Sequence, residues 1–215
     1  MYLISGGAQG SDTLFASLAL QAGIKVDIKT FAGHHYQTPS GAYEAELLRI
    51  SQISDRELYN TYHHEIIPIS KLLNRHTTRK QYIQKLLARD YFEVCSVDEV
   101  YGVGTIEQYQ PFLKVEGGTG YAICVAQKLH VPRIYFYDVS KSTWWFYEFN
   151  KEFGCYDIYT NFGTGFAHMD SNWKREFKPT PGLNRKEKYV AGIGTRFIEP
   201  EDICAFERAI EFMKD

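Results

Sequence analysis

The sequence predicts an α/β fold, a Rossmann-like three-layer sandwich in which helices cover both faces of a mostly parallel central sheet. Short apolar runs lead into glycine turns and then into helical patterns, as in residues 1–22 and 99–129. Strands that alternate with helices in this way form parallel sheets with both faces covered. The chain has 215 residues and a hydrophobic content of 44%, which is enough for a core. We therefore expect residues 1–215 to form one domain.

Each element is assigned from its local pattern. Helical spacing of Leu14, Leu18 and Ala22 predicts a first helix, and Pro200 among acidic residues predicts the start of a last one. The expected strands are residues 1–4, 25–31, 99–104, 133–138 and 189–194. The expected helices are residues 13–22, 41–62, 70–88, 121–129 and 199–214, with a break at Pro68. Aromatic-rich residues 142–149 and 155–159 are expected to pair as a hairpin within an irregular insertion over 139–187.

Composition restricts the function classes. The net charge of −2 lacks the basic excess that is typical of nucleic-acid-binding domains. The four cysteines form no C-x-x-C pair, so buried free thiols in a reducing compartment are expected. No signal peptide and no apolar stretch of membrane-spanning length are visible, so we expect a cytoplasmic protein without a membrane partner.

Three glycine turns precede helices or follow strands: Gly6 to Asp12, Gly117 to Gly120, and Gly194-Thr195-Arg196. Glycine allows the backbone to approach a ligand closely, and amides at a helix start attract anions. In a parallel sheet these turns lie at one edge, where ligands bind. Arg196 is the cation of the three turns and suits a phosphate or a carboxylate. Convergence of the turns predicts a site for a phosphorylated ligand.

These motifs together resemble one superfamily. Ser-Gly-Gly-Ala-x-Gly-x-Asp at 5–12, Ala88-Arg89-Asp90, Gly117-Gly118-Thr119-Gly120 and Gly192-Ile193-Gly194-Thr195-Arg196 are similar to motifs of the Rossmann-like SLOG group. That group joins the DNA-processing protein A domain with the lonely-guy nucleotide phosphoribohydrolases, and the likeness is closest to small bacterial and phage members. The resemblance spans nearly the whole chain and is weakest over 139–187.

The order of the motifs departs from that family. In DNA-processing-like members the Gly-Ile-Gly-Ser/Thr-Arg strand and its helix precede the Ser-Gly-Gly-Ala strand, whereas here they end the chain. The chain therefore resembles a circular permutation, which requires termini that lie close together at the surface. We expect Met1 and Asp215 to be near neighbours.

A second departure concerns chemistry. The phosphoribohydrolases carry a catalytic Glu after their Pro-Gly-Gly-x-Gly-Thr motif, and the matching stretch here lacks it. Glycosidic cleavage needs a carboxylate near the anomeric carbon, and Asp12 or Glu116 are the alternatives. The resemblance therefore favours a sensor or sponge that binds a nucleotide or nucleotide-derived ligand. The alternatives are a hydrolase or transferase acting on an N-glycosidic or phosphate bond, and single-stranded DNA binding.

The expected partners are a nucleotide-derived small molecule and a second copy of the chain in a homodimer. His34, His35 and Tyr36 are expected to select the base, Arg89 to clamp a phosphate or brace the sheet edge, and Asp12 to contact ribose or orient its loop. No metal site and no cofactor are expected, because His63-His64-Glu65 cannot easily bring both histidines to one ion. The full set of predicted ligand-binding residues is Gly6, Gly7, Ala8, Gln9, Gly10, Ser11, Asp12, His34, His35, Tyr36, Arg89, Gly117, Gly118, Thr119, Gly120, Gly194, Thr195 and Arg196.

Overall fold

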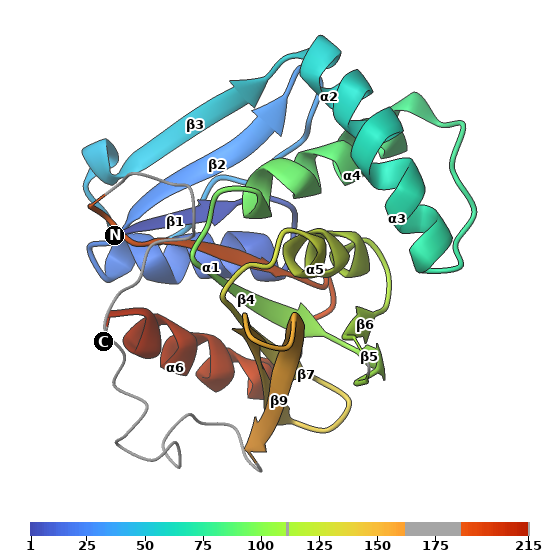
Figure 1. Cartoon of the computed structure of the whole chain (residues 1–215). Helices are drawn as coiled ribbons and strands as arrows, with labels where there is room; N and C mark the ends of the chain where they lie inside the picture. The colour runs from blue at the N-terminus through green and yellow to red at the C-terminus, as the bar shows by residue number, and fades with distance from the viewer. Residues whose placement is uncertain (111, 162–185, 215) are drawn as a thin grey trace.

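An eight-stranded, mostly parallel sheet forms the centre of the computed structural model, which describes residues 1–110, 112–161 and 186–214 (Figure 1). The strand order is β3-β2-β1-β10-β4-β7-β8-β9. The six strands from β3 to β7 run parallel, and β8 and β9 are antiparallel additions at one edge. The strands are β1 (Tyr2–Ser5), β2 (Lys25–Phe31), β3 (Leu48–Ile53), β4 (Glu99–Gly104), β7 (Arg133–Asp138), β8 (Thr143–Asn150), β9 (Cys155–Asn161) and β10 (Tyr189–Gly194), with β5 (Ile106–Gln108) and β6 (Lys114–Val115) in a separate small sheet.

Helices cover both faces of this sheet, as the sequence predicts. The helices are α1 (Ser11–Gln21), α2 (Asp55–Thr61), α3 (Ile67–Leu72), α4 (Gln81–Val94), α5 (Thr119–Lys128) and α6 (Ile203–Lys214). Alternate residues of β4 show the two layers: Tyr101 and Val103 pack with α1 and α6, whereas Val100 packs with α4 and α5. All three side chains are fully buried, as expected of a central parallel strand.

The predicted strands at 1–4, 25–31, 99–104, 133–138 and 189–194 are confirmed within two residues. The predicted aromatic hairpin is also present, as β8 and β9. It is part of the main sheet, because β8 pairs with β7 over six residues and Trp144 lies fully in the core. The rest of the predicted irregular insertion, residues 162–185, lies outside the described residues.

The prediction of one helix over 41–62 is wrong. A 3-10 turn over Ala45–Leu47 is followed by β3, which pairs in parallel with β2, and α2 begins only at Asp55. Ser54 and Glu57 form a capping box at that point, with Ser54 Oγ accepting from Glu57 N at 3.3 Å. Pairing with β2 therefore overrides the helical pattern before this cap.

Two further expectations about this region are wrong. Pro68 does not end the helical path, because it lies in the first turn of α3, directly after a π-helical turn over Tyr62–Ile66. Residues 70–88 do not form one helix either. The chain leaves α3 at Leu73, Asn74 adopts a positive φ of 54°, and α4 starts at Gln81. Arg75 is thereby brought to the start of α5, at the edge of the site described below.

The expectation of buried thiols holds for Cys124 but is wrong for Cys155 and Cys204, which are exposed. Both lie at the periphery, Cys155 at the start of the outermost strand β9 and Cys204 in the first turn of α6. Among the described residues, no helix is long and apolar enough to cross a membrane.

The two ends of the chain lie beside the same residue. Tyr2 N donates to Lys188 O at 2.9 Å, and Lys188 Nζ donates to Met213 O at 3.2 Å. The first strand β1 also pairs with the last strand β10, and Figure 1 shows both ends on one side of the molecule. Asp215 itself lies outside the described residues.

Candidate functional site

A cavity of about 560 Å³ opens at the carboxyl ends of the central parallel strands. The strand ends beneath it are those of β10 and β4, with the turn after β1 beside them. From β1 the chain crosses toward β2, and from β4 it crosses the other way toward β7, so the strand order reverses here. Ligands of open α/β sheets bind at such a point, and this volume is typical of ligand pockets, which span roughly 300–1,000 Å³.

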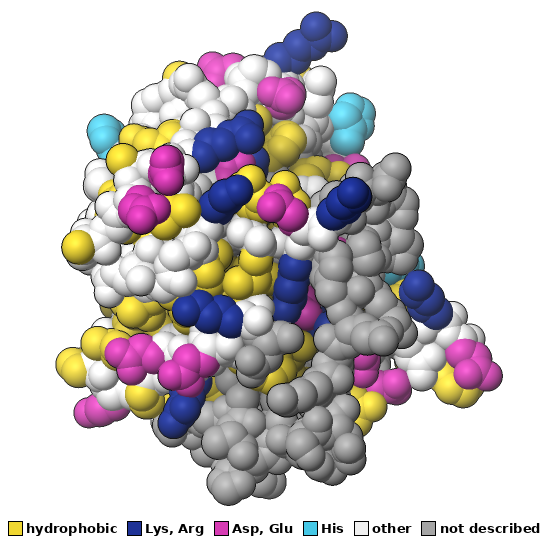
Figure 2. Space-filling model, turned by 90° about the vertical axis from the view of Figure 1, so that its left-hand side faces the viewer, with side chains coloured by type: hydrophobic (Ala, Val, Ile, Leu, Met, Phe, Trp, Pro, Cys, Tyr) yellow, Lys and Arg dark blue, Asp and Glu magenta, His cyan; other side chains and the backbone are white. Residues whose placement is uncertain are grey.

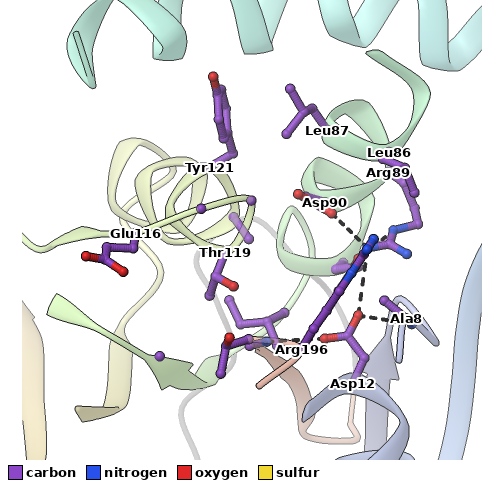
Figure 3. Close-up of a pocket in the computed structure, with 18 of the residues that line it drawn as sticks. Ala8, Asp12, Leu86, Leu87, Arg89, Asp90, Glu116, Thr119, Tyr121 and Arg196 are labelled. Atoms are coloured by element: carbon purple, nitrogen blue, oxygen red, sulfur yellow. Dashed lines mark hydrogen bonds and ion pairs between the residues drawn. The ribbon is translucent and has the colours of Figure 1, made fainter. Parts of the chain in front are cut away.

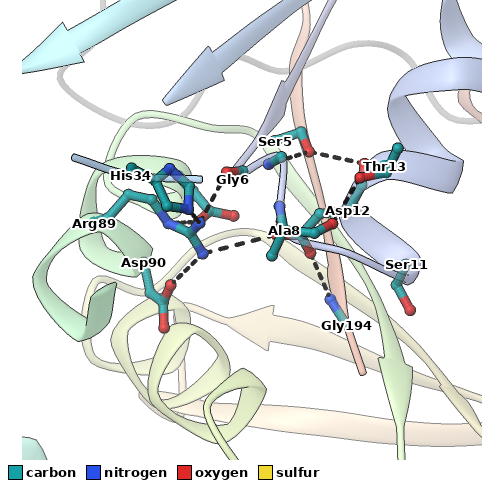
Figure 4. Close-up of polar contacts among 12 residues, drawn as sticks. Ser5, Gly6, Ala8, Ser11, Asp12, Thr13, His34, Arg89, Asp90 and Gly194 are labelled. Atoms are coloured by element: carbon teal, nitrogen blue, oxygen red, sulfur yellow. Dashed lines mark hydrogen bonds and ion pairs between the residues drawn. The ribbon is translucent and has the colours of Figure 1, made fainter. Parts of the chain in front are cut away.

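Asp12 links the turn after β1 to the end of β10. Its Oδ2 accepts from Ala8 N at 3.3 Å, and its Oδ1 accepts from Gly194 N at 3.2 Å. The carboxylate also lies 3.7 Å from Arg89 Nη2. Asp12 therefore holds two of the three predicted glycine turns together, as Figure 4 shows. Of its two predicted roles, this geometry is that of a loop-orienting residue.

Arg89, on α4, is the centre of a buried charge cluster. Its Nη2 donates to Asp90 Oδ1 at 2.9 Å, and its Nε lies 2.9 Å from Glu93 Oε1. Its Nη1 donates to Gly6 O at 2.8 Å, which fixes the guanidinium against the turn after β1 (Figure 4). Gly6 is required there, because a Cβ at this position would overlap the guanidinium. Arg89 therefore braces the sheet edge from within the protein.

Three carboxyl groups share this single guanidinium, so they cannot all ionise easily. Burial raises the pKa of Asp12, and it raises the pKa of Asp90 to about 6 although Arg89 acts in the opposite direction. Burial also raises the pKa of Glu93 well above its usual range. A hydrogen bond between the two carboxyl groups lowers the pKa of Asp90 and raises that of Glu93. The carboxyl groups of Asp90 and Glu93 therefore interact directly beside Arg89, and burial raises the pKa of each.

His34 supports the cluster from the end of β2. Its Nε2 lies 3.3 Å from Arg89 Nη1, and its Nδ1 lies 3.1 Å from Thr30 Oγ1. Because Arg89 can only donate, Nε2 is the acceptor and Nδ1 carries the proton. Burial and the neighbouring Arg89 lower the pKa of His34 to about 4, so the ring is neutral at physiological pH.

Several amides of the first glycine turn already have acceptors inside the protein. Gly7 N donates to Ser5 Oγ, Ala8 N to Asp12, and Ser11 N to Thr195 O at 3.0 Å. Gly10, with a φ of 98°, allows this approach, since a Cβ there would meet Arg196 Cα at 2.6 Å. The turn is thus largely occupied in joining β1, α1 and β10.

The N-terminus of α5 faces the cavity from the opposite wall. The helix begins without a side-chain cap, and a Cβ on Gly117 or Gly118 would meet open space. Arg75 fixes the preceding loop by donating from Nη1 to Gly117 O at 2.6 Å and from Nη2 to Val115 O at 2.5 Å. Gly118 and Thr119, at the start of this helix, line the cavity, and a helix N-terminus favours an anion.

The face of α4 along the cavity changes from apolar to charged. Ile83, Leu86 and Leu87 line it in the first turns of the helix, and Asp90 follows one turn later. Figure 3 shows Leu87 and Tyr121 at one end of the cavity, Asp90 in the middle, and Arg196 rising from the opposite end. The cavity therefore has an apolar end, a carboxylate beyond it, and the Arg196 side chain, which extends from the other end toward that carboxylate.

The structure brings half of the predicted residues into this cavity. Its lining includes Ala8, Asp12, Arg89, Gly117, Gly118, Thr119, Gly194, Thr195 and Arg196. The other predicted residues do not line it: Gly6, Gly7, Gln9, Gly10, Ser11, His34, His35, Tyr36 and Gly120. His34 lies behind Arg89, and His35 is exposed.

The sequence reasoning did not assign a role to Asp90 and Glu93. The available signal was the spacing of Glu93 from Arg89, since positions i and i+4 of a helix lie on one face, whereas Asp90 at i+1 carried no such signal. It also assigned no role to the apolar wall, and it weighed Glu116 only as a substitute catalytic group. Within the described ranges, no three His, Cys, Asp or Glu side chains are arranged to hold a metal ion.

Comparisons with protein-family models, curated proteins and solved structures give no match for this chain. The functional assignment therefore depends on the residues and the geometry of the cavity.

The raised pKa values predict a pH dependence of stability. A folded-state pKa of about 6 for Asp90, against an ordinary value of 3.8, means that the folded state binds more protons between these values. We expect the unfolding free energy of the wild type, relative to Asp90→Asn, to fall as the pH rises from 3.8 to about 6. Urea denaturation in steps between those pH values measures it.

His34 acts with the opposite sign, because its pKa is lowered from 6.5 to about 4 and its neutral form is the stable one in the fold. Both proteins carry His34, so the difference between them isolates the carboxyl cluster. Two parallel stability curves would contradict the predicted protonation.

Proposed function

We propose that this protein binds a nucleotide or a nucleotide-derived phosphorylated ligand in the cavity at the carboxyl edge of the sheet. The observation that supports this most is the order of groups along the cavity: an apolar wall, then the Asp90 carboxylate, then the base of the Arg196 side chain, with the N-terminus of α5 on the opposite wall. This order matches the base, the sugar and the phosphate of a nucleotide. Ile83, Leu86 and Leu87 would contact the base through dispersion and burial.

The phosphate is assigned to Arg196, Thr119 and the first-turn amides of α5. Arg196 is exposed at the rim of the cavity. Burial raises the pKa of Asp12, and the charges of Arg89 and Arg196 act in the opposite direction, so Arg196 lies within electrostatic range of the cavity floor. Arg89 is a weaker candidate for the phosphate clamp, because its Nη1 donates to Gly6 O, its Nη2 donates to Asp90, and its Nε faces Glu93 in an ion pair. In this proposal Arg89 braces the edge, and Arg196 neutralises the ligand.

A binding role without turnover, as a sensor or sponge, agrees with the absence of a Glu from the α5 turn motif at 117–123. The resemblance to the SLOG superfamily remains part of this proposal. The pairing of β1 with β10 and the shared contacts of Tyr2 and Met213 with Lys188 are what a permuted order of that fold requires.

The test is a thermal-shift screen followed by calorimetry. The panel comprises nucleoside mono-, di- and triphosphates, NAD-derived compounds and cyclic dinucleotides. We expect at least one member to stabilise the wild type, and Arg196→Ala to weaken that ligand by about ten- to hundredfold, since a charge-assisted hydrogen bond contributes about 1.5–3 kcal/mol.

Arg208→Ala is the matched control, because Arg208 is exposed on α6 and pairs only with Glu211 among the ion pairs of the described residues. It should leave the affinity unchanged. Stabilisation by no phosphate compound, or equal binding by Arg196→Ala, would contradict the proposal.

A second candidate function is hydrolysis of an N-glycosidic bond. The Asp90 carboxylate lies in the cavity beside Glu93, whose pKa is raised by burial, and a carboxylate near the anomeric carbon can stabilise developing positive charge or activate water. Chromatographic analysis of any bound nucleotide after incubation distinguishes the two functions. Release of the free base supports the hydrolase, and intact ligand supports the sensor.

Single-stranded DNA binding is the least favoured of the three. On the face drawn in Figure 2, basic and acidic side chains of the described residues are interspersed and form no basic stripe. A groove that follows a nucleic-acid backbone needs such a stripe.

A further inference from the structure

We propose that Asp90 binds the vicinal hydroxyl groups of a ribose ring, which makes ribonucleotides, and not deoxyribonucleotides, the ligand class of the cavity. This inference rests on the proposed nucleotide site and adds its sugar specificity. A carboxylate that accepts hydrogen bonds from two adjacent hydroxyl groups recognises a cis-diol, and it loses one of those bonds when the sugar lacks a hydroxyl group.

The position of Asp90 along α4 supports this assignment. Ile83 and Asp90 both line the cavity and are seven residues apart, so they are separated by about 10 Å along the helix axis. Leu86 and Leu87 fill the apolar wall between them. A base packed on this wall places its sugar at Asp90, and the sugar then lies between the base and the cationic end of the cavity (Figure 3).

Asp90 has hydrogen-bonding capacity that its protein partners do not use. An ionised carboxylate offers about four acceptor positions. Arg89 Nη2 takes one on Oδ1, and the hydrogen bond with the Glu93 carboxyl group takes another. Figure 4 shows one carboxyl oxygen of Asp90 meeting Arg89 and the other pointing away from it. The remaining positions are available to a donor in the cavity.

The neighbouring carboxyl groups do not fit this role. Both oxygens of Asp12 accept from backbone amides, and Glu93 is only 1% exposed. Glu116 lies on the opposite wall, next to the α5 N-terminus that we assign to the phosphate. Asp90 is 8% exposed as a residue and lines the cavity, so it is both immobilised and accessible. Arg89 on one side and Glu93 on the other hold its carboxylate in place, which lowers the entropic cost of binding.

The experiment compares sugars on one base. The four ribonucleoside 5′-monophosphates are titrated first, and the base that binds most tightly is then tested as its 2′-deoxy and 3′-deoxy 5′-monophosphates. We expect the wild type to bind each deoxy compound about ten- to hundredfold more weakly, because each compound lacks one hydrogen bond to a charged group. In Asp90→Asn we expect the ribonucleotide to bind with the affinity of the deoxy compounds. Asp55→Asn, the same change on the exposed side of α2, should keep the wild-type ratio.

The wild-type measurement needs no variant, so the inference stays testable if Asp90→Asn does not fold. Equal affinities of the wild type for ribo and deoxy compounds overturn the ribose assignment and leave the nucleotide site standing. Discrimination that persists in Asp90→Asn overturns the role of Asp90. If no nucleotide of the larger panel binds, the proposed function itself fails, which is a different result from binding without discrimination.

Discussion

Replacing Arg89 by methionine is expected to lower the free energy of unfolding by about 3–5 kcal/mol, because it leaves buried carboxylates without their counter-charge. The carboxyl groups of Asp12, Asp90 and Glu93 would lose the guanidinium that lies 2.9–3.7 Å from them. Gly6 O and His34 Nε2 would also lose Arg89 Nη1 as their hydrogen-bond donor. Chemical denaturation at neutral pH measures the loss.

The same variant should regain stability on acidification. Without Arg89, the pKa values of Asp12, Asp90 and Glu93 rise further, and protonation removes their repulsion as the pH falls. Arg208→Met, which breaks only an exposed ion pair on α6, should cost less than about 1 kcal/mol. A loss of similar size in both variants would show that the cluster does not depend on Arg89.

Replacing Asp12 by alanine should cost about 3 kcal/mol and should also abolish ligand binding. The change leaves Ala8 N and Gly194 N without their acceptor, and each buried unpaired amide costs about 1–3 kcal/mol. It also removes one of the links between the turn after β1 and the end of β10, so the cavity floor loses part of its geometry. Denaturation and the ligand titration described above measure the two effects.

Asp12→Asn provides the graded comparison. Its amide oxygen can still accept from Gly194 N, but the charge opposite Arg89 is lost, so we expect an intermediate loss of stability. Asp55→Ala, which breaks an exposed pair with Lys85, should cost less than about 1 kcal/mol. Wild-type stability of Asp12→Ala would contradict the linking role of this carboxylate.

The periodicity of short, buried segments made the sheet predictable. β4 and β7 are apolar runs bounded by turn residues, and burial on both faces is what such runs require. β3 could not be found in the same way, because its edge position leaves Ile50 46% exposed and its pattern is set by pairing with β2. The split between α3 and α4 was hidden for a related reason. Residues 73–80 include the weak helix formers Asn74, His76, Thr77 and Thr78, but the bounds of the break depend on Arg75, which gains its carbonyl contacts with the β6–α5 loop only in the folded chain.

By itself, the sequence determined the α/β class, the five central strands named in advance, and the edge of the sheet at which the glycine turns meet. These follow from local periodicity and from the rule that parallel strands end at one edge. The tertiary structure alone decided what the turns do. Gly6 and Gly10 serve contacts with Arg89 and Arg196, and a helix far away in the sequence brings Asp90 and Glu93 beside them. Protonation states in that cluster depend on burial and on through-space charges, and neither is encoded in local sequence patterns.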